Sequence, residues 1–149
     1  MVAATPGVSE RDVTVPPMTN NRRSQLDRSL QQACLAARIL EDTRGQDVLV
    51  LDLTGVTSIV DFFVLATGTS PRQMKAMAEE AHKILKHGGA KRIGYEGEES
   101  SQWLLQDYGD LVIHLFNPDA RKLYDLEHLW AEAPQVDWKS IAPAVAPRL

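Results

Sequence analysis

The stretch Phe62-Phe63-Val64-Leu65-Ala66-Thr67-Gly68-Thr69-Ser70-Pro71-Arg72-Gln73 joins an apolar run directly to a helix start. Consecutive apolar residues at 62–66 predict a buried strand. Ser70 can accept a hydrogen bond from the backbone N–H of Gln73, the Gln73 side chain can reach back, and Pro71 suits the first helical position. The stretch therefore predicts a strand, a tight turn and a helix in direct succession.

Apolar periodicity extends this pattern in both directions. The helix that follows the turn has a buried stripe of Met74, Met77, Ala78, Ala81, Ile84 and Leu85 and ends at Gly88-Gly89. An earlier helix is predicted by Leu26, Leu30, Ala33, Cys34, Ala37 and Leu40, which fall on one helical face. After Gly45, the apolar run at 48–53 predicts a strand covered on both faces, which we expect to be central in the sheet.

Three short strands are predicted downstream, at 92–96, 102–107 and 111–116, with Tyr108-Gly109 as a hairpin-like turn. Asn117-Pro118 caps a last helix, whose apolar face comprises Leu123, Leu126, Leu129 and Trp130. The order is αββαβββα. The fold class is α/β (α+β), a single domain with a mixed five-stranded sheet and flanking helices, because one connection permits a crossover and the later turns permit hairpins.

The 149 residues fit one domain between two extensions. Residues 1–21 contain Pro16-Pro17 and little periodicity, and residues 134–149 contain three prolines, so we expect both segments to be poorly ordered around a domain at 22–133. The N-terminus lacks the hydrophobic stretch of a signal peptide, and the apolar runs are too short to span a bilayer. We expect a cytoplasmic protein without membrane contact, with an organellar location less favoured.

Charge and cysteine counts limit the chemistry. With 16 basic and 20 acidic residues, the net charge of −4 disfavours a general grip on nucleic acid phosphates, and we expect no sequence-specific nucleic acid binding. Cys34 is the single cysteine, which excludes an intramolecular disulfide and a thiolate zinc cluster. His82 and His87 do not share a helical face, and His114 is expected to be a structural histidine. The sequence predicts no bound metal and no cofactor.

The turn Gly68-Thr69-Ser70 has two interpretations. It lies before a helix N-terminus, where backbone N–H groups can hold a phosphate, so a nucleotide-binding or nucleotidyltransferase-like enzyme is an alternative. However, the turn lacks the GxxxxGK[ST] and GxGxxG patterns, and the chain contains neither the Asp-x-Asp pair that would hold magnesium nor a GxSxG elbow. Helix capping accounts for every residue of the turn and is favoured.

Opposite charges are segregated along the chain. Residues 96–110 carry five carboxylates and no lysine or arginine, whereas residues 70–95 carry six basic and two acidic side chains. Trp103 lies within the acidic stretch and shares one strand face with Leu105 and Asp107. An aromatic side chain ringed by charge is typical of a binding hot spot, although a solvated acidic rim beside a buried tryptophan also explains the pattern.

Four stretches resemble the ribosomal silencing factors, also called the Iojap-like family: residues 52–70, Tyr95-Glu-Gly97, residues 103–110 and residues 124–130. The resemblance runs from Gln25 to Trp138 and leaves the terminal segments out. It implies an α/β domain with a nucleotidyltransferase-like shape but without the catalytic metal site. Gln106 departs from the pattern, because the family more often has an apolar residue there.

The resemblance also implies a function. The protein is expected to bind the large ribosomal subunit through its fourteenth protein and to block association with the small subunit, which represses translation under nutrient limitation or in stationary phase. No catalysis is implied, a homodimer is allowed, and an adaptor for another basic protein would share the same acidic surface. The implied partner-binding residues are Trp103, Glu96, Asp107, Tyr108, Asp110, Arg121 and Tyr124, whereas Asp61 and Ser70 are interpreted as structural.

Overall fold

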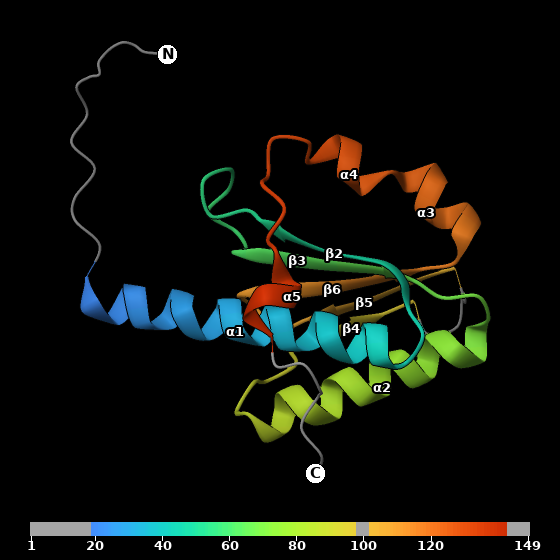
Figure 1. The fold of residues 1–149 in the computed structure, drawn as a ribbon, viewed down its shortest axis with the longest axis horizontal. Helices are drawn as coiled ribbons and strands as arrows, with labels where there is room; N and C mark the ends of the chain where they lie inside the picture. The colour runs from blue at the N-terminus through green and yellow to red at the C-terminus, as the bar shows by residue number, and fades with distance from the viewer. Residues whose placement is uncertain (1–18, 98–101, 143–149) are drawn as a thin grey trace.

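The computed structural model describes residues 19–97 and 102–142 (Figure 1). The helices are α1 (Asn20–Asp42), α2 (Pro71–His87), α3 (Pro118–Tyr124), α4 (Leu126–Leu129) and α5 (Trp138–Ile141). The strands are β2 (Gln46–Asp52), β3 (Phe62–Thr67), β4 (Gly94–Glu96), β5 (Trp103–Asp107) and β6 (Leu111–Phe116). The predicted fold class is confirmed: the chain forms a mixed five-stranded sheet with flanking helices in one domain.

The sheet has the strand order β2-β3-β6-β5-β4. Strands β3 and β6 are parallel, in register from Phe62 opposite Leu111 to Thr67 opposite Phe116, and every other neighbouring pair is antiparallel. The parallel pair requires a long connection, which α2 and the β4–β5 hairpin provide. Both β3 and β6 are buried along their whole length, so they form the centre of the sheet.

The expected central position of the strand at 48–53 is wrong, because β2 lies at one edge of the sheet. Val50 and Leu51 are buried nonetheless, since helices cover both faces of the strand. The outer edge is paired with the C-terminal segment: Asp52 N–H donates to the Pro134 carbonyl and Val136 N–H to the Val50 carbonyl, each at 2.8 Å. A covered edge strand therefore has the same apolar pattern as a central one.

The expectation of poor order from residue 134 onward is wrong for residues 134–142. Trp138 is buried, its indole Nε1 donates to the Val48 carbonyl at 3.2 Å, and the Arg38 guanidinium lies 4.9 Å from its ring centroid. At the other end, Asn20 and Asn21 already belong to α1, which Thr19 caps. The remainder of the two expected extensions, residues 1–18 and 143–149, lies outside the described residues.

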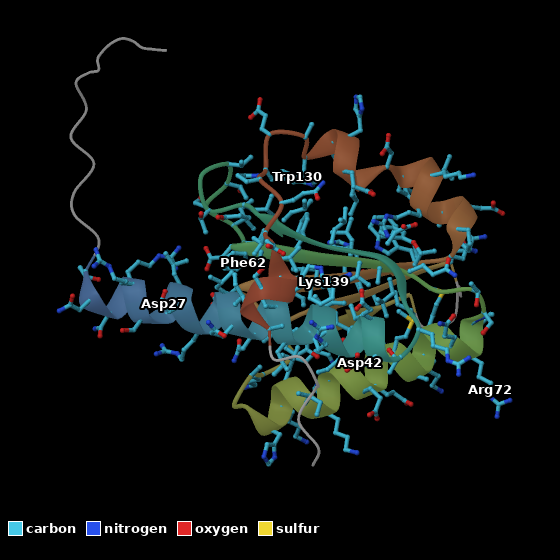
Figure 2. All side chains as sticks on the ribbon, viewed as in Figure 1. Asp27, Asp42, Phe62, Arg72, Trp130 and Lys139 are labelled. Atoms are coloured by element: carbon cyan, nitrogen blue, oxygen red, sulfur yellow. The ribbon has the colours of Figure 1, made fainter. Side chains whose placement is uncertain are left out.

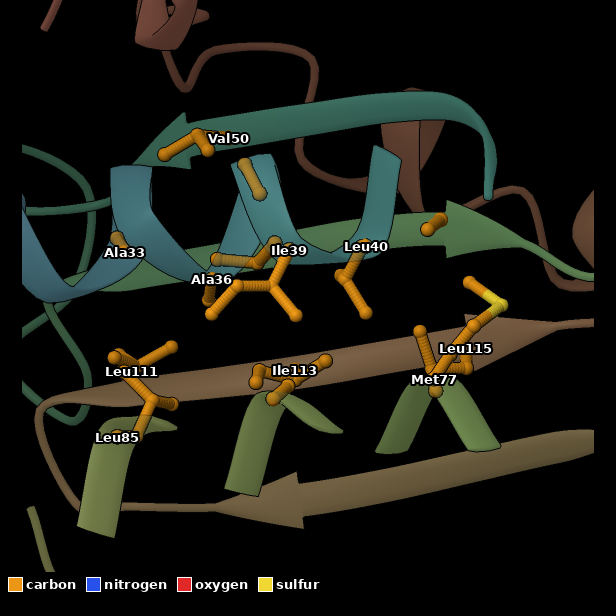
Figure 3. Packing of buried hydrophobic residues seen from close by; sticks show 14 of the residues in the cluster. Ala33, Ala36, Ile39, Leu40, Val50, Met77, Leu85, Leu111, Ile113 and Leu115 are labelled. Atoms are coloured by element: carbon orange, nitrogen blue, oxygen red, sulfur yellow. The ribbon is translucent and has the colours of Figure 1, made fainter. Parts of the chain in front are cut away.

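Two helical layers enclose the sheet (Figure 1). Helices α1, α2 and α5 cover one face, and α3 and α4 lie over the other. Figure 3 shows the first of these interfaces, where α1 and α2 enclose a core with the central strands through Ala33, Ala36, Ile39, Leu40, Met77, Leu85, Leu111, Ile113 and Leu115. The first face is covered mainly by the long helices α1 and α2, whereas only short helices cover the second. This difference in cover leaves part of the second face open.

The strand, turn and helix that the sequence predicted at 62–87 are confirmed. Ser70 Oγ accepts a hydrogen bond from Gln73 N–H at 3.1 Å, and the Gln73 side chain reaches back to Thr69 N–H at 2.7 Å. Helix α2 ends at His87 with Gly88 as its C-cap, and Gly89 follows with φ of +96°, a left-handed conformation that glycine adopts readily. The cap chemistry in the sequence was therefore sufficient to locate this element.

The expected last helix is broken in two. Asp125 adopts φ of +46° between α3 and α4, and Leu123 and Leu129 are 76% and 70% exposed, so two of the four predicted core positions point to solvent. Leu126 is buried as predicted. The capping of α3 is also as predicted, because Asn117 Oδ1 accepts from Ala120 N–H at 2.7 Å.

Arg121 explains how α3 packs on the sheet. Its buried guanidinium donates to Thr67 Oγ1 at 2.9 Å, to the Asp47 carbonyl at 2.9 Å and to Glu127 Oε2 at 3.0 Å. This one side chain links β3, β2 and α4, which turns the polar side of α3 inward and leaves Leu123 outside. Arg121 is thus a structural residue here.

We expect Arg121→Met to lower the free energy of unfolding by about 3 kcal/mol, because removing a buried cation leaves its hydrogen-bond acceptors unpaired. Urea denaturation followed by circular dichroism measures the change. Lys122→Met, at the exposed neighbouring position, is the matched control and should change stability little. Equal midpoints for the two variants would contradict this role of Arg121.

Candidate functional site

Five aromatic rings follow one another across the sheet face beneath α3 and α4. We call this set the aromatic row: Tyr124, Trp103, His114, Phe63 and Trp130. Successive ring centroids lie 4.6, 5.8, 4.6 and 5.6 Å apart, and the rings come from α3, β5, β6, β3 and the residue after α4. The row thus joins elements that are far apart in the sequence.

Trp103 holds an intermediate position between core and surface. Its indole packs against Phe116 with ring centroids 5.1 Å apart and against the half-exposed ring of Tyr124. Its Nε1 donates to His114 Nδ1 at 3.1 Å, which fixes the orientation of the indole. Trp103 is therefore neither a core residue nor a freely exposed one, but a partly open aromatic surface held rigidly by its neighbours.

His114 is buried, and burial lowers its pKa to about 4. The imidazole is consequently neutral at physiological pH. Its Nε2 is buried without a hydrogen-bond partner among the described residues, while Nδ1 accepts from Trp103. The expectation of a structural histidine agrees with this packing.

A groove of about 320 Å³ opens beside the aromatic row. Its floor and walls are mainly apolar, and they comprise Ile59, Val60, Phe63, Leu105, Val112, His114 and Trp130. Glu96 and Asp107 also line it, so two carboxylates border an apolar hollow, which we call the acidic groove. Figure 2 shows Trp130 between α4 and the sheet. The groove exists because the short helices α3 and α4 leave this part of the face uncovered.

Gly97 explains the Tyr95-Glu-Gly97 motif. Its φ is +87°, and a Cβ at this position would collide with the Trp103 carbonyl oxygen. The close approach of backbone allows β4 to pair with β5, so that Glu96 lies opposite Leu105 and reaches the groove. The glycine thus positions an acidic side chain beside the aromatic row.

The structure brings together four of the seven residues expected to bind a partner. Trp103 and Tyr124 belong to the aromatic row, and Glu96 and Asp107 line the acidic groove. These four lie on one side of the sheet, and the alternation along β5 accounts for Trp103 and Asp107 among them. Two further carboxylates of the acidic stretch, Glu98 and Glu99, lie outside the described residues.

The other three expected residues lie elsewhere. Tyr108 lies against α2 on the opposite face, with its hydroxyl 3.0 Å from His82 Nδ1, and burial raises its pKa to about 12. Asp110 accepts a hydrogen bond from Ser29 Oγ of α1 at 3.2 Å. Arg121 is enclosed in the network that anchors α3. Tyr108 and Asp110 are close to Trp103 in the sequence, which suggested one shared surface. The pleat of the strand and the turn after it separate them in the fold.

Residues interpreted as structural have that role in the fold. Asp61 is buried and accepts from the Arg22 guanidinium at 2.9 Å, and Ser70 caps α2. Gln106, which departs from the family pattern, is also buried, and its side-chain amide donates to the Ala78 carbonyl at 3.1 Å and accepts from the Tyr108 hydroxyl at 3.3 Å. A polar residue is therefore tolerated there because both ends of the amide are paired.

Two of the three backbone N–H groups in the turn at 68–70 donate hydrogen bonds within the fold. Gly68 N–H donates to the Phe116 carbonyl at 2.8 Å, and Thr69 N–H donates to the Gln73 side chain. This geometry favours the capping interpretation over a phosphate site. Across residues 19–97 and 102–142, His, Cys, Asp and Glu side chains form no group of three or more that could hold a metal ion. None of the helices in those ranges is long and apolar enough to cross a membrane.

Sequence reasoning missed Phe63 and Trp130 as site residues and Ile59, which is 87% exposed at the groove. Phe63 was assigned to a buried strand and Trp130 to a helix face. The alternation of Val112, His114 and Phe116 along β6 was the available signal, because it places three large side chains on one face of a central strand. Which face remains open cannot be read from that alternation.

Fold and site together define a class: an α/β domain that presents an aromatic row and an acidic groove on one face of its sheet. Residues 26–148 match the family described as "Ribosomal silencing factor during starvation". A ribosomal silencing factor from Halalkalibacterium halodurans is 36% identical over 107 residues, which is 72% of this chain and 92% of that protein. The chain therefore belongs to the ribosomal silencing factor family.

Further relatives and solved structures agree. A chloroplastic Iojap protein from Arabidopsis thaliana is 31% identical over 73% of this chain and 45% of its own length. A mouse protein named for mitochondrial assembly of the large ribosomal subunit is 35% identical over 62% of this chain and 42% of its own length. A crystal structure from Chromobacterium violaceum has a TM-score of 0.64 and 39% identity, covering 72% of this chain and 85% of that one.

We expect acid to destabilise the fold through His114. Its pKa is about 4 in the folded protein and about 6.5 in an unfolded chain. Between pH 6.5 and about pH 4, the unfolded state therefore binds a proton at His114 that the folded state does not. The free energy of unfolding falls over this pH range by on the order of 3 kcal/mol. Urea midpoints at several pH values measure the slope. His114→Phe should show a shallower slope, His87→Gln should not, and parallel slopes for all three proteins would contradict this role.

Proposed function

We propose that this protein binds the large ribosomal subunit through its fourteenth protein and blocks joining of the small subunit, which represses translation when nutrients are limiting. The observation that carries the proposal is the rigid, partly open Trp103 ring in an aromatic row that borders a groove lined by two carboxylates, all on one face of the sheet. Membership in the silencing factor family and the names of the relatives support it. The block is steric, so the proposal requires neither catalysis nor a cofactor.

The chemistry of the face suits a ribosomal protein. Such proteins are basic, and carboxylates at the rim accelerate encounter with a basic partner in a salt-dependent manner. The aromatic row supplies the desolvated contact that gives an interface most of its affinity. Because Trp103 is already fixed by His114 and Tyr124, little side-chain entropy is lost on binding. The cytoplasm is the proposed site of action.

The first test replaces Trp103 with Ala. We expect this variant to lose co-sedimentation with purified large subunits and to lose inhibition in a subunit-joining assay, because truncating a central hot-spot aromatic costs at least about 2 kcal/mol of binding. Trp103→Phe, which keeps a ring in the row, should retain part of the binding. Full binding by a folded Trp103→Ala protein would place the interface elsewhere.

A second test removes the rim charges. Glu96→Gln with Asp107→Asn should slow association with the large subunit and weaken its dependence on salt, because rim charges act mainly on the rate of encounter. The Asp107→Asn change keeps a side-chain oxygen in place of the Asp107 Oδ1 that accepts from Gly109 N–H at 2.8 Å. Asp27→Asn with Asp42→Asn, at exposed positions of α1, is the control of equal charge. Identical salt dependence in both double variants would exclude the acidic rim from the interface.

A further inference from the structure

A second charged surface lies on the opposite face of the β4–β5 edge. A hollow of about 550 Å³ is lined by Glu79, His82, Lys83, Lys86, Arg92 and Tyr95, and we call it the basic hollow. Three of these six side chains are permanent cations and one is an anion. Lys83 and Lys86 are exposed on α2, one helical turn apart, so their ammonium groups are available to a ligand.

The hollow is organised by more than lysines on a helix. The Arg92 guanidinium lies over the Tyr95 ring, 4.3 Å from its centroid, so one cation is held in place against an aromatic wall. The pKa of His82 is lowered by burial and by the nearby Arg92 and Lys86, which indicates a positive potential within the hollow. The Nδ1 atom of His82 lies 3.0 Å from the Tyr108 hydroxyl oxygen, within hydrogen-bond distance.

The two surfaces meet at a single strand. Tyr95 and Glu96 are consecutive in β4, so the pleat directs them to opposite faces: Tyr95 lines the basic hollow, and Glu96 lines the acidic groove. The thin β4–β5 edge therefore separates a surface suited to a basic protein from one suited to an anion. A partner that has a basic protein next to phosphate groups could therefore contact both the acidic groove and the basic hollow.

We infer that the basic hollow binds the phosphate backbone of RNA, with Lys83, Lys86 and Arg92 as the contacting cations. RNA is favoured over a free nucleotide because the cations are spread along an open hollow rather than around one enclosed pocket. The choice of ribosomal RNA as the natural source rests on the proposed function. Recognition is independent of sequence, because it rests on charge and on an aromatic wall. The net charge of −4 does not oppose it, since the acidic groove lies on the other face.

The test measures binding of the whole protein to a fluorescein-labelled uridine 20-mer and to an RNA hairpin, by anisotropy at several salt concentrations. We expect binding that weakens as salt concentration rises. The double variant Lys83→Gln with Lys86→Gln should bind about tenfold more weakly, and its plot of log K against log salt should be less steep by ~1.4. Lys122→Gln with Lys139→Gln, which removes the same charge at exposed positions elsewhere, should bind RNA as the wild type does. AMP and inorganic phosphate, added as competitors, distinguish RNA from free phosphate as the ligand.

The outcomes separate this inference from the proposed function. Trp103→Ala should retain RNA binding while losing the large subunit, and the Lys83/Lys86 double variant should lose RNA binding and also weaken subunit binding. Equal RNA binding by the two double lysine variants, or displacement by AMP and phosphate at low concentration, would overturn the inference even if the protein binds the subunit. RNA binding that depends on Lys83 and Lys86 in a protein that does not bind the subunit would support the hollow as an RNA site and refute the proposed function.

Discussion

The parallel pairing of β3 with β6 is the constraint on which the rest of the structure depends. Both strands are buried along their length, so each face of the sheet needs a helical cover. Parallel strands also need a long connection, and here it contains α2 and the β4–β5 hairpin. The layers, the sheet order and the position of the β4–β5 edge all follow from this one pair.

The two covers differ, and this difference produces the functional surface. Long helices α1 and α2 cover most of one face around a mainly aliphatic core, part of which Figure 3 shows. On the other face, α3 and α4 are short and separated by a left-handed residue, and Arg121 draws α3 over β2 and β3. The part of the face over β5 and β6 is left to aromatic side chains. The aromatic row is thus the border of the apolar core on this face, with Phe63 and His114 buried and Trp103, Tyr124 and Trp130 partly exposed.

Elements with local signals were predictable, whereas contacts between distant segments were not. Ser70, Pro71 and Gln73 located α2, because a helix cap is formed by neighbours in the chain. The edge position of β2 was missed because the segment that covers it begins at Pro134, about eighty residues later in the chain. The same reason applies to Trp138, which looked like part of a tail and is instead packed against α1 and β2.

By itself, the sequence determined the strand, turn and helix at 62–87, the mixed sheet, the acidic stretch around Trp103 and the basic stretch before it. These features depend on periodicity, caps and charge, which are local properties. Only the tertiary structure decided that Tyr108, Asp110 and Arg121 turn away from Trp103, and that Phe63, His114 and Trp130 join it. The physical reason is that a surface is made by strand pairing and by incomplete helical cover, and both depend on contacts between residues far apart in the chain.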